Sequence, residues 1–418
     1  MLQGPHGPFF AQAADRLRAA GAEVLRIGFN RADEVFWGRR PGYEAYRGPL
    51  PDWAAHLARR VAEERITDIV LYGDTRPVHA EAAKMARARG IRLHVFEEGY
   101  LRPYWVTYER GASNGNSALM RIDIATMRRA LARPDLPQPD APAHWGDLRQ
   151  HVFYGALYHF FVLALNRAYP NFSPHRGIAV AEEFRLHLRR LLLMPFHAVE
   201  RMAATRRVTG GGFAYHIVLL QLEHDASFRF HSPFASMTEF VDLCLEGFAE
   251  GAPAGHHLVF KAHPLDDGRA PVARGIRDTA RRLGIADRVH FLRGGKLAPL
   301  LDPAAGAVTV NSTAGQQALW RGLPLKAFGG AVYAKPEFVS DQGLAEFFAS
   351  PRPPDAAAYR DYRRFLLETS QIPGGYYSSR GRAQLLRRVV GLMLADADRY
   401  ETLLERKAAV RQHLVAHQ

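Results

Sequence analysis

Residues 68–98, DIVLYGDTRPVHAEAAKMARARGIRLHVFEE, decide the fold class of this chain. The apolar run at 68–72 predicts a strand, residues 78–89 predict a helix that stops at Gly90, and residues 91–96 predict a second strand. Strands that alternate with helices of this length are typical of a parallel, doubly wound sheet.

The same alternation continues on both sides of this stretch. Before it, the sequence predicts a helix at 8–21, a strand at 23–29, and a helix at 53–64 that Asp52 caps. A second series begins after residue 210. Its predicted strands are 215–220, 257–261, 289–292 and 307–311, and its predicted helices are 236–250, 271–283 and 313–321.

Two such series predict an α/β, GT-B-like chain with two Rossmann-type doubly wound domains that face a cleft. We expect the domains at 1–150 and 211–350. A helical, basic linker at 151–210 joins them, and a helical segment follows at 351–418.

Composition limits the compartment and the partners. Cys244 is the one cysteine among 418 residues, which excludes an internal disulfide framework and indicates a reducing compartment. The net charge of +13 favours an anionic partner, although dispersed arginines also fit a general compositional bias. No zinc-finger or RNA-recognition pattern occurs, so we expect no nucleic acid partner.

The apolar run at 154–165 is shorter than the ~20 residues of a bilayer span, and the start lacks a secretory signal. We therefore expect a cytoplasmic protein, peripheral on the inner membrane face at most.

Chemically active residues follow several predicted strands. Glu97 and Glu98 come directly after one apolar run, at the expected start of a loop. Lys261-Ala-His263-Pro264 and Asn311-Ser312-Thr313 follow two others. Because ligands bind at the carboxyl ends of parallel strands, we expect these groups to form one site between the two domains.

Two of these motifs suit a phosphate. The helix expected after Asn311 offers unpaired N–H groups, to which Ser312 and Thr313 add hydroxyls; alternatively, one hydroxyl is only the N-cap. Pro264 restricts His263 to an extended backbone, and Lys261 adds positive charge. Alternatively, His263 has only a structural role and binds no phosphate.

A third motif supplies a carboxylate. In Gln221-Leu-Glu-His-Asp225-Ala-Ser, at the end of the first strand of the second series, Asp225 is a candidate nucleophile or base. Its alternative role is an Asx-turn cap. Enzymes that act on glycosidic bonds usually use two catalytic carboxylates, and Glu98 and Asp225 are candidates for such a pair.

Three loops of the first domain are further cleft candidates, although each also fits an ordinary turn. Their candidate residues are Gly4 and His6, Asp74 and Arg76, and Asn116. Residues 184–202 mix apolar and arginine positions, so they fit either an anionic lipid surface or an interdomain helix.

Together these motifs resemble the KpsS-type capsule polysaccharide proteins, which are β-Kdo transferases. The resemblance runs from residue 1 to about residue 335. The motifs that carry it are Gln3-Gly-Pro-His-Gly-Pro, Gly73-Asp-Thr-Arg-Pro, Phe96-Glu-Glu-Gly-Tyr-Leu-Arg-Pro, Asn114-Gly-Asn-Ser, Lys261-Ala-His-Pro-Leu-Asp and Asn311-Ser-Thr-Ala-Gly.

The resemblance implies a CMP-β-Kdo donor for the second domain and a lysophosphatidylglycerol acceptor for the first. It also implies retention of configuration, action at the inner face of the cytoplasmic membrane, and other capsule proteins as partners. The Glu-Glu-Gly, His-Pro and Ser-Thr motifs are similar to those of bacterial sialyltransferases.

By that similarity, His263, Ser312 and Thr313 would hold the CMP phosphate. The wider set of expected nucleotide-sugar-binding residues also contains Gln221, Lys261, Pro264 and Asn311. Glu98 would be the acid/base and Glu97 a supporting residue. Asp225 resembles the aspartate in the Gln-x-Glu-x-Asp-Ala-Ser context of related retaining Kdo transferases, which implies that it is the covalent nucleophile. His224 occupies a position at which those relatives often have an acidic residue. Either Arg76 or Arg102 would neutralise the Kdo carboxylate.

No cofactor is expected, and we expect independence from metal ions, because no Asp-x-Asp pattern follows a strand of the two predicted domains. Two alternatives stay open. One is a transferase of another CMP- or CDP-activated group, of the sialyltransferase or glycerophosphotransferase type. The other is a non-catalytic scaffold for capsule assembly or export.

Overall fold

A computed structural model describes residues 1–132, 148–172, 180–266, 268 and 270–405. The chain divides into two compact units. Unit 1 comprises Met1–Ala118, Arg128–Ala181 and Arg364–Gln418, and unit 2 comprises Leu119–Met127 and Glu182–Arg363. Each unit therefore combines stretches that are distant in sequence, whereas the predicted domains were contiguous ranges.

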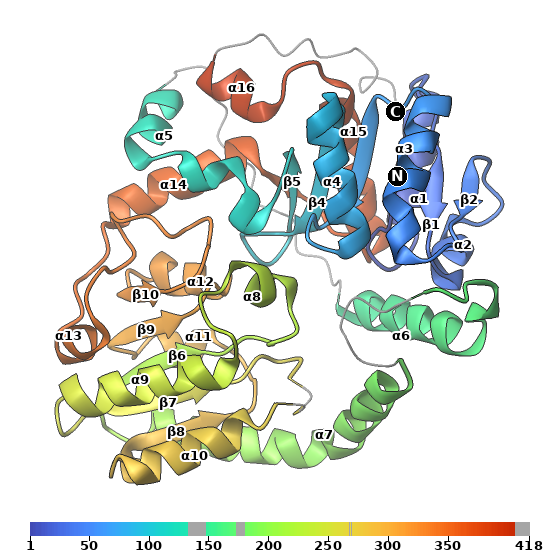
Figure 1. The fold of residues 1–418 in the computed structure, drawn as a ribbon. Coiled ribbons are helices and arrows are strands. Elements are labelled where there is room, and N and C mark those ends of the chain that lie inside the picture. The colour runs from blue at the N-terminus through green and yellow to red at the C-terminus, as the bar shows by residue number, and fades with distance from the viewer. Residues whose placement is uncertain (133–147, 173–179, 267, 269, 406–418) are drawn as a thin grey trace. The chain divides into compact units, whose positions relative to one another are not determined.

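Unit 2 contains a five-stranded, fully parallel sheet in the order β10-β9-β6-β7-β8. Its strands are β6 (Tyr215–Leu219), β7 (His257–Lys261), β8 (Val289–Leu292), β9 (Gly306–Thr309) and β10 (Leu325–Ala327). The order proceeds outward from β6 in both directions, which is the doubly wound Rossmann arrangement. The strand order therefore reverses between β6 and β9 (Figure 1).

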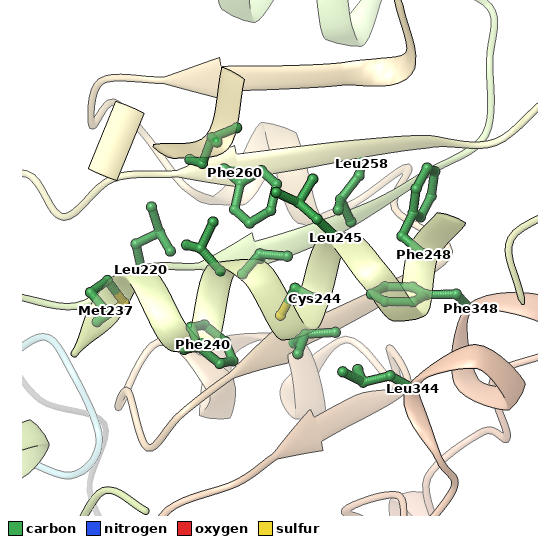
Figure 2. Packing of buried hydrophobic residues seen from close by; sticks show 14 of the residues in the cluster. Leu220, Met237, Phe240, Cys244, Leu245, Phe248, Leu258, Phe260, Leu344 and Phe348 are labelled. Atoms are coloured by element: carbon green, nitrogen blue, oxygen red, sulfur yellow. The ribbon is translucent and has the colours of Figure 1, made fainter. Parts of the chain in front are cut away.

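Helix α9 (Met237–Gly251) covers the apolar face of this sheet. Ser236 caps it by accepting a hydrogen bond from the Glu239 N–H at 3.2 Å. Its buried side chains include Phe240, Cys244 and Phe248, and Figure 2 shows them packed among residues of β7 and α13 (Leu344–Ala349). Cys244 is a fully buried free thiol.

Unit 1 contains a mixed sheet in the order β11-β5-β4-β3. Its strands are β3 (Asp68–Tyr72), β4 (Arg92–Glu98), β5 (Trp105–Arg110) and β11 (Gln371–Pro373). Strands β3 and β4 are parallel, as residues 68–98 predicted, whereas β5 pairs antiparallel with both neighbours. Two α/β units, each with parallel strands, confirm the α/β, GT-B-like class.

The position of the two glutamates corrects one expectation. Glu97 and Glu98 are the last residues of β4, paired with Thr107 and Val106 of β5, and do not begin a loop. The antiparallel β5 extends the ladder beyond the apolar run, so the strand includes the polar pair. Their backbones are consequently fixed by the sheet.

The C-terminal stretch completes the core of unit 1. Helix α15 (Ser379–Leu394) buries Leu385, Val389 and Met393 against Phe9 and Phe96, within one apolar cluster. The segment expected to be merely helical thus supplies an edge strand, β11, and a core helix.

The remaining helices of unit 1 are α1 (Phe9–Ala19), α2 (Arg31–Trp37), α3 (Trp53–Glu63), α4 (Pro77–Arg89), α6 (Leu148–Ala164) and α16 (Arg399–Leu404). Strands β1 (Arg26–Gly28) and β2 (Tyr43–Ala45) form a separate parallel pair. Asp52 makes no side-chain cap on α3, contrary to expectation, because it ends a 3-10 turn with helical backbone angles.

In unit 2 the other helices are α8 (Ala226–His231), α10 (Val272–Arg282), α11 (Ala298–Leu301), α12 (Gly315–Trp320) and α13 (Leu344–Ala349). Three helices extend across the limits of the units: α5 (Ile124–Leu131), α7 (Val180–Thr209) and α14 (Ala356–Thr369).

Candidate active site

Two loops meet where the strand order of unit 2 reverses. The Gln221 side chain, just beyond β6, donates to Asn311 Oδ1 at 2.7 Å, and its Oε1 accepts from the Asn311 N–H at 2.9 Å. This reciprocal pair joins the carboxyl ends of β6 and β9, the usual ligand-binding position of a doubly wound sheet.

The other side-chain hydrogen bonds of Asn311 go to α8. Its Nδ2 donates to the carbonyl oxygens of Ser227 at 2.8 Å and His231 at 3.2 Å, so the buried amide holds both ends of α8. Asn311 and Gln221 therefore shape the loops that surround the switch point. They were predicted as binding residues, and their contacts in unit 2 support a positioning role.

His263 lines a pocket beside this junction. The pocket is open to solvent, and its walls include Glu223, His224 and Asp266. The Leu265 N–H donates to His263 Nδ1 at 3.1 Å. Because Nδ1 accepts this bond, the neutral ring carries its proton on Nε2, which can donate to an anion.

Lys261 ends β7 with its side chain buried. Burial lowers the pKa of its ammonium group from 10.5 to about 8. Within the described part of unit 2, no acidic side chain offsets this effect. An anionic ligand would supply the missing negative charge.

The Ser312 and Thr313 loop is stabilised from within. Ser312 Oγ accepts from the Ala314 N–H at 3.2 Å, and the Ser312 carbonyl oxygen accepts from the Tyr333 hydroxyl at 2.5 Å. The following helix, α12, begins at Gly315 and has six residues, fewer than the predicted helix at 313–321. Ser312 thus makes an ST-turn.

Asp225 is the exposed N-cap residue of α8, and its side chain makes no cap hydrogen bond. The Asx-turn alternative is therefore not supported. The neighbouring Glu223 instead accepts from the Met237 N–H at 3.0 Å and so anchors α9.

In unit 1, two tyrosines hold Glu98. Its Oε1 accepts from the hydroxyls of Tyr72 at 2.9 Å and Tyr377 at 3.1 Å. Burial, followed by the charge of Glu98, raises the pKa of Tyr72 well above its ordinary value, which keeps this phenol a donor. Neither tyrosine was predicted as a site residue, although Gly374-Gly375 before Tyr376 and Tyr377 was a usable signal for Tyr377.

Glu97 and Asp74 organise the adjoining loops. Asn114 Nδ2 donates to Glu97 Oε2 at 3.4 Å, and Asn116 Nδ2 donates to the buried Asp74 at 3.1 Å. Asp74 also accepts from the Ser113 N–H at 3.3 Å. The predicted loops at 73–77 and 114–117 thus gather at the end of β4.

Gly99 permits the turn after Glu98. A Cβ atom at Gly99 would lie 2.2 Å from the carbonyl oxygen of Trp105. Any side chain there would displace the end of β4 or the start of β5. Glycine is therefore required beside the glutamate pair.

The other predicted residues differ in position. The Arg76 guanidinium lies 5.5 Å from the centre of the Tyr72 ring and is thus near the Glu98 network. Arg102 is exposed and donates to the Gly99 carbonyl oxygen at 3.1 Å. Gly4 packs against Phe10. His6 stacks on Tyr158 of α6, with ring centres 4.1 Å apart.

The proposed catalytic carboxylates are thus placed within different units, Glu98 in unit 1 and Asp225 in unit 2. Among the described residues, no group of three or more His, Cys, Asp or Glu side chains is suited to a metal ion. No helix in the same ranges is long and apolar enough to cross a membrane.

Comparison with known proteins identifies relatives over most of the chain. The family described as "Capsule polysaccharide biosynthesis protein" matches residues 67–377. The capsule polysaccharide export protein KpsS of Escherichia coli is 30% identical over 380 residues, which cover 90% of this chain and 96% of that protein. The capsule polysaccharide modification protein LipB of Neisseria meningitidis is 32% identical over 387 residues, which cover 90% and 91%.

Solved structures are more distant. The beta Kdo 2,7 transferase KpsC of Thermosulfurimonas dismutans aligns with a TM-score of 0.36 at 14% identity, covering 77% of this chain and 92% of that one.

Proposed function

The chain belongs to the capsule polysaccharide biosynthesis protein family, and from this membership we propose that it is a glycosyltransferase. It transfers β-Kdo from CMP-β-Kdo to a lysophosphatidylglycerol acceptor, with retention and without a metal ion, and so begins the linker of a capsular polysaccharide. The observation that carries this proposal is the joining of the Gln221 and Asn311 loops at the switch point of unit 2, beside the His263 pocket.

The donor side of the proposal rests on charge. Kdo and the phosphate of CMP are anions, and Lys261 is a buried cation with a lowered pKa. His263, with its proton on Nε2, can donate to the phosphate. A nucleoside monophosphate is already a good leaving group, so these donors can stabilise its departure without a metal ion.

The chemical step assigns two carboxylates. Asp225 attacks the anomeric carbon and forms an ester bond while the bond to the phosphate oxygen breaks, and CMP leaves with the electron pair. In the second step Glu98 removes the proton from the acceptor hydroxyl, whose oxygen attacks the same carbon. The Asp225 carboxylate is released, and two inversions give retention.

The acceptor side of the proposal rests on Glu98. Two tyrosine hydroxyls fix one oxygen of its carboxylate, and the sheet fixes its backbone. A base held in this way keeps one orientation toward an acceptor hydroxyl. We propose that the enzyme acts at the inner face of the cytoplasmic membrane together with other capsule proteins.

The test is transfer from CMP-Kdo, generated in situ, to a fluorescent lysophosphatidylglycerol. We expect a product whose β linkage is visible by NMR, and we expect turnover to persist in EDTA. If product forms only with CMP-sialic acid, the donor assignment is wrong. If no product forms with either donor, the proposal is contradicted.

Asp225→Asn provides the sharper experiment. We expect it to lower turnover by at least about 10³-fold while CMP binding changes less than about threefold, because the nucleophile acts only in the chemical step. Asp278→Asn, another exposed aspartate of unit 2, is the matched control. Equal turnover of the two variants would remove Asp225 from the mechanism.

A further inference from the structure

Helix α6 exposes a continuous apolar face. Val152 is 64% exposed, Phe153 is 60% exposed and Phe160 is 55% exposed, and Leu163 continues the strip one turn later. At 3.6 residues per turn, positions 152, 153, 156, 160 and 163 share one side of the helix. A strip that includes two exposed phenylalanines indicates a contact surface.

The opposite face of α6 attaches the helix to unit 1. Tyr158 stacks on His6 at 4.1 Å, and His151 stacks on Tyr377 at 4.2 Å. Val162 is buried. Because these contacts hold the helix, the outer residues are not needed to pack the core.

The charges around the apolar strip select its partner. Residues 148–168 contain no aspartate or glutamate, and exposed arginines lie near both ends, at Arg149 and Arg167. A second protein with an apolar patch would not require such cationic ends. An apolar strip with flanking arginines fits a lipid surface with anionic headgroups, where Arg and aromatic side chains occupy the boundary region.

We propose that the outer face of α6 lies in the plane of an anionic lipid bilayer. Its phenylalanines occupy the boundary between headgroups and acyl chains, and Arg149 and Arg167 pair with lipid phosphates. The helix does not span the bilayer, in agreement with its composition and length.

The orientation of α6 gives its lipid contact a second role, and this role rests on the proposed function. His151, near the first turn, stacks on Tyr377, and the Tyr377 hydroxyl donates to Glu98. A lipid headgroup at the Arg149 end is therefore close to the residue that would activate the acceptor hydroxyl. The same helix thus binds the membrane and directs a lipid-borne acceptor to Glu98.

Cosedimentation of the full chain with vesicles tests the surface. The vesicles are phosphatidylcholine with or without phosphatidylglycerol. We expect the wild type to bind the anionic vesicles, and the double variant Phe153→Ser/Phe160→Ser to bind them at least about tenfold more weakly, because each exposed ring loses apolar burial. The matched control, Leu50→Ser/Leu243→Ser, removes two exposed leucines elsewhere and should bind normally.

A second pair of variants keeps the test independent of folding. Arg149→Gln/Arg167→Gln changes only exposed side chains and should weaken binding to anionic vesicles alone. Leu192→Ser/Phe196→Ser tests the exposed apolar residues of α7, where 184–202 was the predicted lipid contact. Loss of binding in this α7 variant with unchanged binding of the α6 variants would overturn the proposal.

Two further measurements separate the possible explanations. If sedimentation equilibrium shows that Phe153→Ser/Phe160→Ser dissociates an oligomer while vesicle binding is unchanged, the face is an interface between copies and the proposal is wrong. Transfer to a short-chain, water-soluble acceptor should be unchanged in this variant, whereas transfer to vesicle-borne acceptor should fall about tenfold. Vesicle binding through α6 without any transfer would refute the proposed function and leave the lipid surface supported.

Discussion

Replacing Lys261 with methionine should stabilise unit 2 and impair nucleotide binding at the same time. Lys261 is only 6% exposed, and burial lowers the pKa of its ammonium from 10.5 to about 8. At about 1.36 kcal/mol per pKa unit, the folded state bears a cost of about 3 kcal/mol for keeping this charge at neutral pH. Methionine has a similar length without the charge, so Lys261→Met should recover about 2–3 kcal/mol.

The pH dependence follows from the sign of the shift. Below pH 8 the ammonium is charged in both the folded and the unfolded chain, and the full cost applies. Between pH 8 and pH 10.5 the unfolded chain binds more protons than the folded chain, so wild-type stability rises with pH. The advantage of Lys261→Met should therefore be largest at pH 7 and shrink toward pH 10.5.

The assay is urea unfolding at pH 7 and at pH 10, followed by hydrogen exchange of peptides from β7 and α9, which report on unit 2. CMP binding is measured by calorimetry at pH 7, where we expect a loss of at least about tenfold. A variant less stable than the wild type at pH 7, or a stability difference independent of pH, would refute the reasoning about a buried, uncompensated charge.

Three further predictions concern single contacts. Gly99→Ala should lower the free energy of unfolding, measured by calorimetry, by about 2 kcal/mol or more, because the new Cβ atom would lie 2.2 Å from the Trp105 carbonyl oxygen. Tyr377→Phe should lower turnover about tenfold at unchanged CMP affinity, because Glu98 loses one of two donors; equal turnover would exclude an orienting role. Phe248→Ala should lower the free energy of unfolding in urea by about 3–5 kcal/mol, since the ring is fully buried, and a loss below 1 kcal/mol would contradict that packing.

Local sequence predicted much of the secondary structure. Strands β3, β7 and β8 have the predicted limits, and α4 ends at Gly90, whose φ of 64° suits glycine. These elements depend on runs of apolar residues and on caps, both of which are short-range. Helix α12 proved shorter than predicted because Ser312 uses its hydroxyl in a turn.

The unpredicted elements depend on distant partners. Strand β11 has only three residues and forms because β5 offers an edge. Strand β4 includes Glu97 and Glu98 because β5 pairs with them, which the polarity of these residues gave no reason to expect. Pairing energy from another part of the chain overrides such local preferences.

The sequence by itself determined the alternation of strands and helices and the motifs that identify the family, because both are encoded in neighbouring residues. Only the tertiary structure decided how those motifs are supported. Gln221 meets Asn311 across 90 positions, and Tyr377 meets Glu98 across 279. Such pairs form because burying the apolar cores brings distant polar groups together, where an unmade hydrogen bond would be costly.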